Sequence, residues 1–265
     1  MTDKEIKILI VDDEQVVVDS LIKICSLKGF QSKPAYTAEE GLQLLTKEKF
    51  DLILCDIMLP EMNGFEFLDE LNARKVDTPA IMMTGYSTVE NAVKALNQGA
   101  IDYVPKPFAV DEILSVLHRG VNYIEIKRRI KKADSTEIVF VECPSKFSRL
   151  GCLSWTYVTE EGSALVGVTD MYLKTLDTFE YMQLKEVDDN IYQGNSCVKF
   201  ISDDEHAHDL LSPISGKIIE RNDELLVNKN IIEKDPFFKG WLYRVIPSDI
   251  EYELKNLASC SSDQI

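Results

Sequence analysis

Hydrophobic and polar positions alternate in blocks along the first half of the 265-residue chain. Short apolar runs, the pattern of buried strands, are each followed by a stretch whose apolar residues recur every three or four positions, as in a helix with one buried face. Five such pairs follow one another between residues 6 and 132. Repeated strand–helix pairs predict a parallel sheet with helices on both faces. The predicted strands lie in IKILIVD, QSKPAY, FDLILCD, PAIMMTG and DYVPK.

The pattern changes after residue 150. The segment CLSWTYVTEEGSALVGVT predicts a strand, a turn at Glu160-Glu161-Gly162 and a second strand. SCVKFIS and GKIIER predict further strands, whereas DMYLKTLDTF and DIEYELKNLA predict short helices. Residues 133–150 mix one strand-like run with Pro, Ser and Gly, which is typical of a domain boundary. We therefore expect a second domain that is mainly β with short helices.

Composition is that of a soluble globular protein, with 45% hydrophobic and 28% charged residues, and the length favours two domains. No apolar run approaches the roughly 20 residues of a membrane span. Met1–Glu5 lack the pattern of an export signal, so a cytoplasmic location is expected. The six cysteines are scattered without a C-x-x-C pair, which favours free, packed thiols over a redox or zinc site.

The net charge of −16 is shared unequally. Residues 1–133 hold 17 Lys+Arg and 21 Asp+Glu, net −4, whereas residues 134–265 hold 12 and 24, net −12. The second half would repel nucleic acid, and no segment resembles a helix-turn-helix, so no DNA partner is expected. The basic cluster at residues 127–132 ends a predicted helix, where it suits the helix dipole as a solvated face.

Polar residues stand where the predicted parallel strands end. Asp12 and Asp13 follow the first run, Asp56 ends the third, Thr84 the fourth and Lys106 the fifth. Because the carboxyl ends of parallel strands meet at one edge of the sheet, these side chains should lie together. Three crowded carboxylates repel one another unless a cation lies among them, and Mg²⁺ prefers oxygen ligands. The sequence therefore predicts a magnesium site at this edge.

The motifs VDDE, LCDIMLPEMNGFEFL, MMTGYS and DYVPKPF are similar to those of the receiver domain of bacterial two-component response regulators. The resemblance covers residues 1–125 and implies a flavodoxin-like α/β fold with five parallel strands. It implies a sensor histidine kinase or phosphotransfer protein as partner. The resemblance implies that Asp56 is the phosphoacceptor and that Lys106 and Thr84 contact the phosphoryl group. It implies that Thr84 and Tyr103 are switch residues and that the Lys106-Pro107 bond is cis. It also implies that Mg²⁺ binds Asp12, Asp13, Asp56 and the backbone carbonyl of Met58.

The residue types suit that chemistry. Phosphoryl transfer depends on holding nucleophile and leaving group in line while cations neutralise the equatorial oxygens, roles that Asp56, Lys106 and Mg²⁺ would fill. Two alternatives remain at this point: an acid cluster in another doubly wound protein, and a receiver-like fold that has lost the reaction. No kinase or nucleotide-hydrolase motif is present, so the only expected chemistry is phosphorylation and dephosphorylation of the chain itself.

A long helix is predicted from Val110 to Lys132. Ile113, Leu117, Val121 and Ile124 form an apolar stripe at spacings of four, four and three. The first turns are expected to cover the sheet. The last two turns, within residues 126–150 that we assign to a helical extension and linker, could instead form a connecting or dimerising helix, which leaves a homodimer open.

The second half resembles the glycine cleavage system H protein, a relative of lipoyl and biotinyl carrier domains, over residues 151–257. The resemblance rests on LSWTYV, ALVGVTDMYLKTL and LLSPISGKIIERNDELLVNKNIIEKDPFFKGWLYRVIPSD, and leaves residues 258–265 as a tail. In the family a lysine a few residues before S-P-x-S-G carries lipoate. Two alignments place Glu205 or Asp204 at that position, and a carboxylate cannot form the amide that holds lipoate. Lipoate is therefore not expected.

Two alternatives concern the same hairpin. Lipoylation at Lys199 would require an insertion before Ser212, and we place Lys199 in the strand instead. His206 and His208, among four carboxylates between residues 203 and 209, could chelate a divalent metal if both face the same side. The favoured alternative is a hydrated acidic hairpin tip with two exposed histidines.

Two functions follow. In the first, the protein is a response regulator whose carrier-like domain, unable to hold lipoate, is a protein-binding output with a target of unknown identity. In the second, it is a lipoyl group carrier gated by phosphorylation. The absence of lysine at positions 204 and 205 favours the first.

Overall fold

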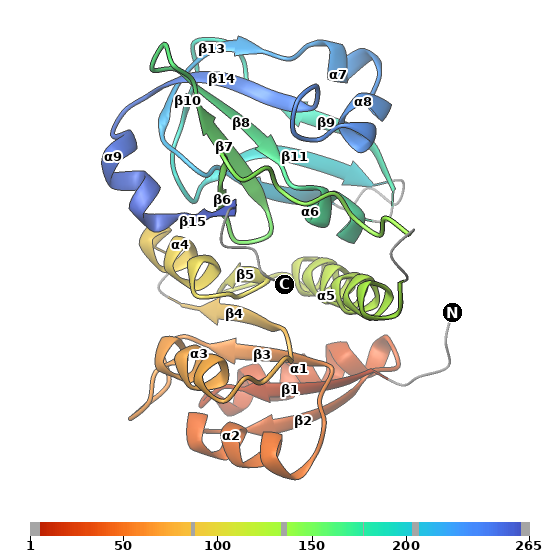
Figure 1. The fold of residues 1–265 in the computed structure, drawn as a ribbon. Coiled ribbons are helices and arrows are strands. Elements are labelled where there is room, and N and C mark those ends of the chain that lie inside the picture. The colour runs from red at the N-terminus through yellow and green to blue at the C-terminus, as the bar shows by residue number, and fades with distance from the viewer. Residues whose placement is uncertain (1–5, 86–87, 134–136, 177, 203–206, 261–265) are drawn as a thin grey trace. The chain divides into compact units, whose positions relative to one another are not determined.

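The structure is a computed structural model, which describes residues 6–85, 88–133, 137–176, 178–202 and 207–260 (Figure 1). The chain divides into two compact units, each described by itself below. The first unit comprises residues 1–91 and 98–124, and the second comprises residues 92–97 and 125–265. Among the described residues, no helix is both long enough and apolar enough to cross a membrane.

The first unit is built on a five-stranded parallel sheet with the strand order β2-β1-β3-β4-β5. Every residue of β3 and β4 is buried, which explains why LILCD and AIMMT are uninterrupted apolar runs apart from their last residues. The order reverses at β1, and ligands bind at such reversals in open α/β sheets. The strands are β1 (Lys7–Val11), β2 (Gln31–Ala35), β3 (Leu52–Asp56), β4 (Ala80–Thr84) and β5 (Asp102–Pro105).

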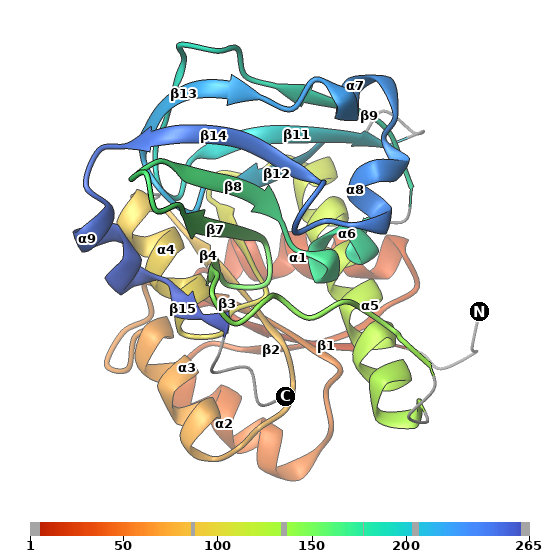
Figure 2. The ribbon, with the colours of Figure 1, turned by 45° about the horizontal axis from the view of Figure 1, so that its top comes forward.

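A helix follows each of these strands, as the alternation predicted. In both views α2 and α3 lie on one face of the sheet and α1 lies on the other (Figures 1 and 2). The helix after β5 runs without a break over the range that its periodicity predicted, with Ile113 and Leu117 buried. The helices are α1 (Gln15–Leu27), α2 (Ala38–Lys47), α3 (Gly64–Ala73), α4 (Val89–Asn97) and α5 (Val110–Lys132).

The start of α3 is defined by its sequence. The Asn63 side chain accepts hydrogen bonds from the amides of Phe65 and Glu66, and the Glu66 carboxylate accepts one from the amide of Asn63. This capping box satisfies amides that a helix N-terminus leaves unpaired. Gly64 is required there because a Cβ would overlap the carbonyl oxygen of Asp56. The helix therefore begins directly against the end of β3.

The second unit is mainly β, as predicted, and all its strand pairs are antiparallel. One sheet has the order β10-β13-β14-β8-β7-β6-β15, and a three-stranded sheet has the order β12-β11-β9. The strands are β6 (Ser148–Leu150), β7 (Ser154–Val158), β8 (Ala164–Val168), β9 (Phe179–Leu184), β10 (Asn190–Ile191), β11 (Ser196–Ser202), β12 (Ala207–Leu211), β13 (Gly216–Arg221), β14 (Trp241–Pro247) and β15 (Ala258–Ser259).

Short helices connect these strands. Two of them lie in DMYLKTLDTF and DIEYELKNLA, where short helices were predicted, although β9 already begins at Phe179. The α-helices are α6 (Asp170–Thr175), α7 (Glu224–Val227), α8 (Asn230–Lys234) and α9 (Ile250–Glu253), and a 3-10 turn, η1, covers Leu254–Asn256.

Two buried aromatic residues organise the second unit. Trp155 in β7 is fully buried, and its indole N–H donates to the carbonyls of Val168 at 2.9 Å and Pro236 at 3.2 Å. The Tyr243 hydroxyl in β14 donates to the carbonyl of Cys197 at 2.9 Å and accepts from the amide of Lys185 at 2.8 Å. Both polar tips are satisfied, so their burial adds packing without an unpaired donor.

The prediction of free thiols is wrong for two cysteines. Cys143 and Cys260 form a disulfide across 117 positions of the sequence, with a Cα–Cα distance of 5.6 Å. Sequence spacing could not reveal this pair because tertiary structure alone brings the two positions together. Cys25, Cys55, Cys152 and Cys197 form no disulfide with another described residue, as predicted. Ala258 and Ser259, which the sequence placed in a tail, form β15 and pair with β6.

Candidate functional site

Three acidic side chains meet at the carboxyl edge of the first sheet. The carboxylate oxygens of Asp12, Asp13 and Asp56 lie within 4.8 Å of one another. Val11 of β1 is the register partner of Cys55 of β3, so the residues that follow them reach the same edge. Asp12 and Asp56 are buried, whereas Asp13 is exposed. The structure therefore brings together the three acids that the strand ends predicted.

Lys106, the residue directly after β5, joins this cluster. Its ammonium Nζ lies 2.7 Å from Oδ2 of Asp12 and 2.8 Å from Oδ2 of Asp56, and its side chain is 8% exposed. The amide N–H of Lys106 donates to the carbonyl of Thr84 at 2.7 Å, which holds the residue at the end of β4. The Lys106-Pro107 bond is cis, as predicted. One cation thus bridges two buried carboxylates contributed by different strands.

Glu14 and the Met58 amide complete the contacts, and the sequence did not predict either. Glu14 places Oε1 3.3 Å from the Lys106 ammonium, and its amide donates to Oδ1 of Asp12 at 3.0 Å. The amide of Met58 donates to Oδ1 of Asp56 at 3.2 Å. The available signal for Glu14 was its place as the third acid of VDDE. The Met58 carbonyl as a metal ligand stays a prediction.

The electrostatics of the cluster suit a divalent cation. Burial raises the pKa of Asp12 above its ordinary value of 3.8, the Asp56 charge adds to this, and the Lys106 ammonium opposes it. Burial would lower the pKa of Lys106, but its ion pairs with Asp12 and Asp56 outweigh burial and raise it. Asp12, Asp13 and Asp56 with the nearby Glu14 are four carboxylates around a single ammonium, which leaves uncompensated negative charge. Oxygen donors with that excess fit Mg²⁺, which Asp12, Asp13 and Asp56 could hold.

The two predicted switch residues stand on neighbouring strands. Thr84 is the last residue of β4 and is fully buried. Tyr103 in β5 is half-buried, but its hydroxyl is buried and has no hydrogen-bond partner among the described residues. Burial raises the pKa of Tyr103 to about 12. A buried hydroxyl without a partner is destabilising, so another position of this ring would be favoured if it reached water or an acceptor.

A buried ion pair lies beside Tyr103. Asp102 Oδ2 is 2.6 Å from Nη2 of Arg119 in α5, and Arg119 Nη1 donates to the Ser115 hydroxyl at 2.9 Å. Asp102 Oδ1 accepts the amide of Tyr103 at 2.8 Å. The pair joins β5 to α5 and fixes the backbone on which Tyr103 stands. Its sequence signal was an arginine within an otherwise buried helix face, which sequence reasoning overlooked.

The carrier-like hairpin is formed by β11 and β12. Asp204, Glu205 and His206 lie outside the described residues. Lys199 lies within β11, as predicted, where it is exposed and its Nζ is 3.9 Å from Oδ1 of Asp209, its register partner. The prediction of an exposed His208 is wrong, because His208 is 6% exposed and lies opposite Phe200 on the buried face. Within the described ranges, the only acid, histidine and cysteine cluster able to hold a metal is the one at Asp12.

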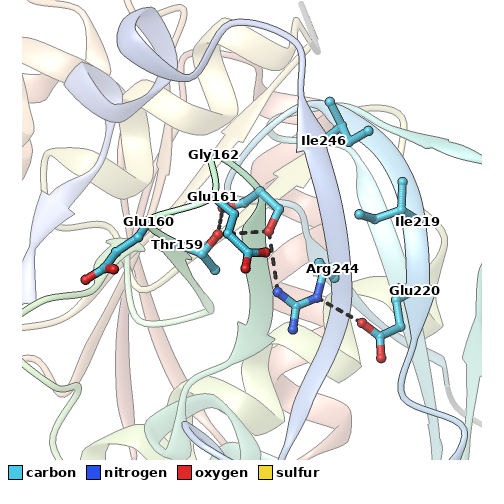
Figure 3. Close-up of a pocket in the computed structure, with 9 residues that line it drawn as sticks. Thr159, Glu160, Glu161, Gly162, Ile219, Glu220, Arg244 and Ile246 are labelled. Atoms are coloured by element: carbon cyan, nitrogen blue, oxygen red, sulfur yellow. Dashed lines mark hydrogen bonds and ion pairs between the residues drawn. The ribbon is translucent and has the colours of Figure 1, made fainter.

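An open groove of about 790 Å³ lies elsewhere on the second unit. The turn between β7 and β8, which carries Glu160 and Glu161, forms one wall, and the exposed Ile219 and Ile246 line it from β13 and β14. Arg244 donates to Glu220 at 2.8 Å and to the Ser163 hydroxyl at 3.4 Å. Figure 3 shows Arg244 with Glu220 on one side and the Glu161–Gly162 turn on the other. The groove combines apolar side chains with an acidic rim.

Comparison with known proteins also divides the chain into two parts. Residues 8–118 match the family model of the response regulator receiver domain, and residues 147–264 match that of the glycine cleavage H-protein. The chain therefore joins a flavodoxin-like receiver domain to an H-protein domain, which confirms both resemblances. Neither match reaches residues 119–146, which hold the second half of α5 and the segment before β6.

Curated relatives match the receiver half alone. The regulatory protein AtoC of Escherichia coli (strain K12) is 40% identical over 125 residues, which are 47% of this chain and 27% of AtoC. The response regulator MprA of Mycobacterium tuberculosis (strain ATCC 25618 / H37Rv) is 32% identical over 132 residues, 50% of this chain and 55% of MprA. The chain thus spans about half the length of MprA and about a quarter of AtoC.

A solved structure covers the same part. The crystal structure of a CheY-like response regulator receiver domain protein from Methanospirillum hungatei JF-1 is 36% identical, with a TM-score of 0.45. It covers 47% of this chain and 99% of its own.

Proposed function

We propose that this protein is a response regulator of a two-component phosphorelay, phosphorylated on Asp56 with Mg²⁺, and that its H-protein domain is an output that carries no lipoate and binds another protein. The observation that carries the proposal is the Lys106 ammonium, which lies 2.7 Å and 2.8 Å from the buried carboxylates of Asp12 and Asp56. This arrangement supports the proposal because Asp56, the proposed nucleophile, lies beside a cation and a second acid. The proposed chemistry involves no substrate other than the phosphodonor and water.

In the proposed reaction an oxygen of Asp56 attacks the phosphorus of a phosphohistidine on a kinase or phosphotransfer protein. The O–P bond forms, the P–N bond breaks, and the imidazole leaves with the electron pair and is protonated. Lys106 would then exchange its pairing with the Asp56 carboxylate for the incoming phosphoryl oxygens. Hydrolysis later returns the Asp56 carboxylate and inorganic phosphate.

Bound at Asp12 and Asp13, Mg²⁺ would supply positive charge to the phosphoryl oxygens and to the carboxylate cluster. Asp12 is suited to hold it because burial disfavours its charge, so a nearby divalent cation would stabilise the ionised form. The Met58 amide, 3.2 Å from Oδ1 of Asp56, keeps the nucleophile oriented before transfer. Thr84, at the end of the adjacent strand, would donate its hydroxyl to the phosphoryl group.

Intact-protein mass spectrometry tests this proposal. The full chain is incubated with a small acyl phosphate and Mg²⁺, and a gain of one phosphoryl group is expected. Asp56→Asn should remove the gain, whereas Asp19→Asn, which changes an exposed carboxylate on α1, should keep it. Equal phosphorylation of Asp56→Asn and the unaltered protein would show that the site lies elsewhere. No gain in any sample would favour a receiver domain that has lost its reaction.

The output role rests on the carrier position. Asp204 or Glu205 occupies the place of the carrier lysine, and Lys199 lies within a strand rather than at the hairpin tip. The groove at Arg244 supports protein binding, because exposed Ile219 and Ile246 beside the acidic rim suit a partner segment with apolar and basic side chains.

Mass measurement also separates the output role from the alternative of a gated lipoyl carrier. Protein purified from a host that makes lipoate should show no lipoyl adduct, and Lys199→Arg should have the same mass profile apart from the substitution. An adduct on the unaltered protein that Lys199→Arg lacks would establish the carrier function. Amide exchange in residues 137–260 should change after phosphorylation if Asp56 controls the output, and unchanged exchange would contradict that control.

A further inference from the structure

The segment that precedes β6 is attached to the rest of the second unit at several points. We define the strap as residues 137–147, which have no helix or strand and follow α5 in the chain. The amide of Val141 in the strap donates to Oδ2 of Asp170 at 2.6 Å, and Asp170 is fully buried at the start of α6. Cys143 is disulfide-bonded to Cys260. The strap is therefore joined covalently to the far end of the described chain.

The C-terminal end depends on the strap in turn. The amide of Cys260 donates to the carbonyl of Phe147 at 3.0 Å, and β15 pairs with β6 through only two residues. A two-residue strand has little stability of its own. The disulfide is thus the strongest attachment that the structure provides for residues 258–260.

We propose that Cys143 and Cys260 are a reversible thiol–disulfide pair, and that reduction by a dithiol releases the strap and β15 from the rest of the second unit. The proposal goes beyond the response-regulator function and does not require Asp56 phosphorylation. It assigns a redox modification site to a pair of which one member, Cys143, lies outside both ranges that the family models match.

The surroundings of the pair determine which sulfur can react. Cys143 is half-buried, whereas Cys260 is 5% exposed and packs in a cluster with Phe147, Trp155 and Phe237. The Phe147 ring centroid lies 4.8 Å from that of Trp155. A reductant would therefore attack the Cys143 sulfur, with Cys260 as the leaving thiolate in apolar surroundings. Release of that thiolate is favoured only if the segment moves toward water, which couples reduction to opening.

Three of the other cysteines are poorly suited to exchange. Burial raises the pKa of Cys25 to about 11 and that of Cys197 to about 12, and it raises the pKa of Cys55 well above the ordinary value. At neutral pH these side chains are thiols, which are poor nucleophiles toward a disulfide. Cys152 is half-buried and is the natural control. Exchange is thus not expected at Cys25, Cys55 or Cys197, and a Cys152→Ser variant tests whether Cys152 takes part.

The proposed reduction is a two-step thiol–disulfide exchange. One thiolate of the dithiol attacks Sγ of Cys143, the Cys143–Cys260 bond breaks, and the Cys260 thiolate takes a proton. The second thiol of the reductant then attacks the mixed disulfide and releases Cys143. Two electrons and two protons pass from the dithiol to the protein, which gains two thiols while the reductant becomes a cyclic disulfide. Loss of the link removes a constraint over 117 positions, so the C-terminal end should open more often.

The test uses the full chain, folded, with dithiothreitol as the dithiol. Samples are alkylated in denaturant before and after reduction, and the modified cysteines are located by peptide mass spectrometry. We expect four alkylated cysteines before reduction, since four are free in the structure, and added labels on Cys143 and Cys260 afterwards. Amide exchange at residues 258–260 should rise by about tenfold or more on reduction and return on reoxidation.

Matched variants complete the test. Cys260→Ser should show the fast exchange without any reductant, and Cys152→Ser should behave like the unaltered protein. If Cys260→Ser does not fold, the reduced and reoxidised wild-type samples still decide the matter. Alkylation of Cys143 and Cys260 before reduction would show that they form no disulfide. A disulfide in the folded protein that resists dithiothreitol would contradict reversible reduction. Unchanged amide exchange after reduction would contradict the release of the strap and β15.

Discussion

The receiver domain and the H-protein domain retain different parts of the families that they match. In the receiver domain Asp12, Asp13 and Asp56 lie together at one edge of the sheet, and Lys106 contacts two of these acids, Asp12 and Asp56. In the H-protein domain Trp155 and Tyr243 are fully buried in the core, and the sequence resemblance predicts carboxylates at the position of the carrier lysine. Under the proposed function, the receiver domain has kept its reacting residues, whereas the H-protein domain has kept its core and lost the carrier lysine.

The difference shows that a fold and its chemistry are held by different residues. Trp155 and Tyr243 stabilise the H-protein domain through burial and satisfied hydrogen bonds, which a change at a hairpin tip does not affect. The receiver acids do the opposite, because Asp12 is buried at an energetic disadvantage that stability alone would not favour. Residues that destabilise the fold in this way are expected where a reaction requires them.

The largest expected effect is the loss of stability of the H-protein domain when its core is damaged, while phosphorylation of the receiver domain persists. Trp155→Ala should lower the free energy of unfolding of the H-protein domain by about 4 kcal/mol, because it removes a fully buried indole and its two hydrogen bonds. Urea unfolding followed by circular dichroism measures this, and phosphorylation of Asp56 should persist. Tyr181→Ala, at an exposed aromatic of β9, should change stability by less than about 0.5 kcal/mol. Loss of phosphorylation together with the core would show that the domains do not act separately.

A smaller effect is expected from removing the cation of the receiver cluster. Lys106→Met should lower the free energy of unfolding by about 3 kcal/mol, since Asp12 and Asp56 stay buried without their ion-pair partner. Millimolar Mg²⁺ should recover part of this loss, and amide exchange in β1 and β3 reports it locally. Lys33→Met, which removes a half-exposed pairing with Glu48, serves as the comparison. No recovery with Mg²⁺ would argue against a metal at these acids.

The pH dependence of the free energy of unfolding of the receiver domain tests the same acids without a substitution. The pKa of Asp12 is raised in the folded protein above the ordinary value of 3.8. Protonated Asp12 therefore contributes its full stabilisation below pH 3.8, and this stabilisation is lost as the pH rises through the pKa of the folded state. Mg²⁺ favours ionised Asp12 and should reduce that loss, so the stabilisation by Mg²⁺ should increase with pH across this window. Denaturant unfolding at several pH values measures it. In Asp12→Asn this increase should be weaker, and an equal increase would assign it to another group.

The smallest expected effect concerns the switch tyrosine. Tyr103→Phe should raise the free energy of unfolding by about 1 kcal/mol, because it removes a buried hydroxyl without a hydrogen-bond partner among the described residues. Phosphorylation of Asp56 should be unchanged, while the change in amide exchange of residues 137–260 on phosphorylation should diminish. Thermal unfolding and amide exchange measure the two effects. A clear loss of stability would mean that the hydroxyl has a partner in the folded protein.

The sequence by itself determined the order of the strands and helices and the edge at which the acids meet. Alternation of apolar runs with amphipathic stretches predicted β1 to β5 and α1 to α5, because burial on two faces requires continuous apolar strands. The strand ends then predicted that Asp12, Asp56 and Lys106 would converge. These features depend on neighbours in the chain and on the general geometry of parallel sheets.

Tertiary structure alone decided the contacts between distant positions. The Cys143–Cys260 disulfide spans 117 positions, and the Asp102–Arg119 pair joins a strand to a helix. His208 is buried because strand alternation directs it toward Phe200, whereas its acidic neighbours in the sequence suggested exposure. Glu14 reaches Lys106 across 92 positions. The contacts between distant residues depend on how closely separate elements approach, which a local pattern does not encode. The burial of His208 depends on which face of its strand packs against the core, which alternation alone does not decide.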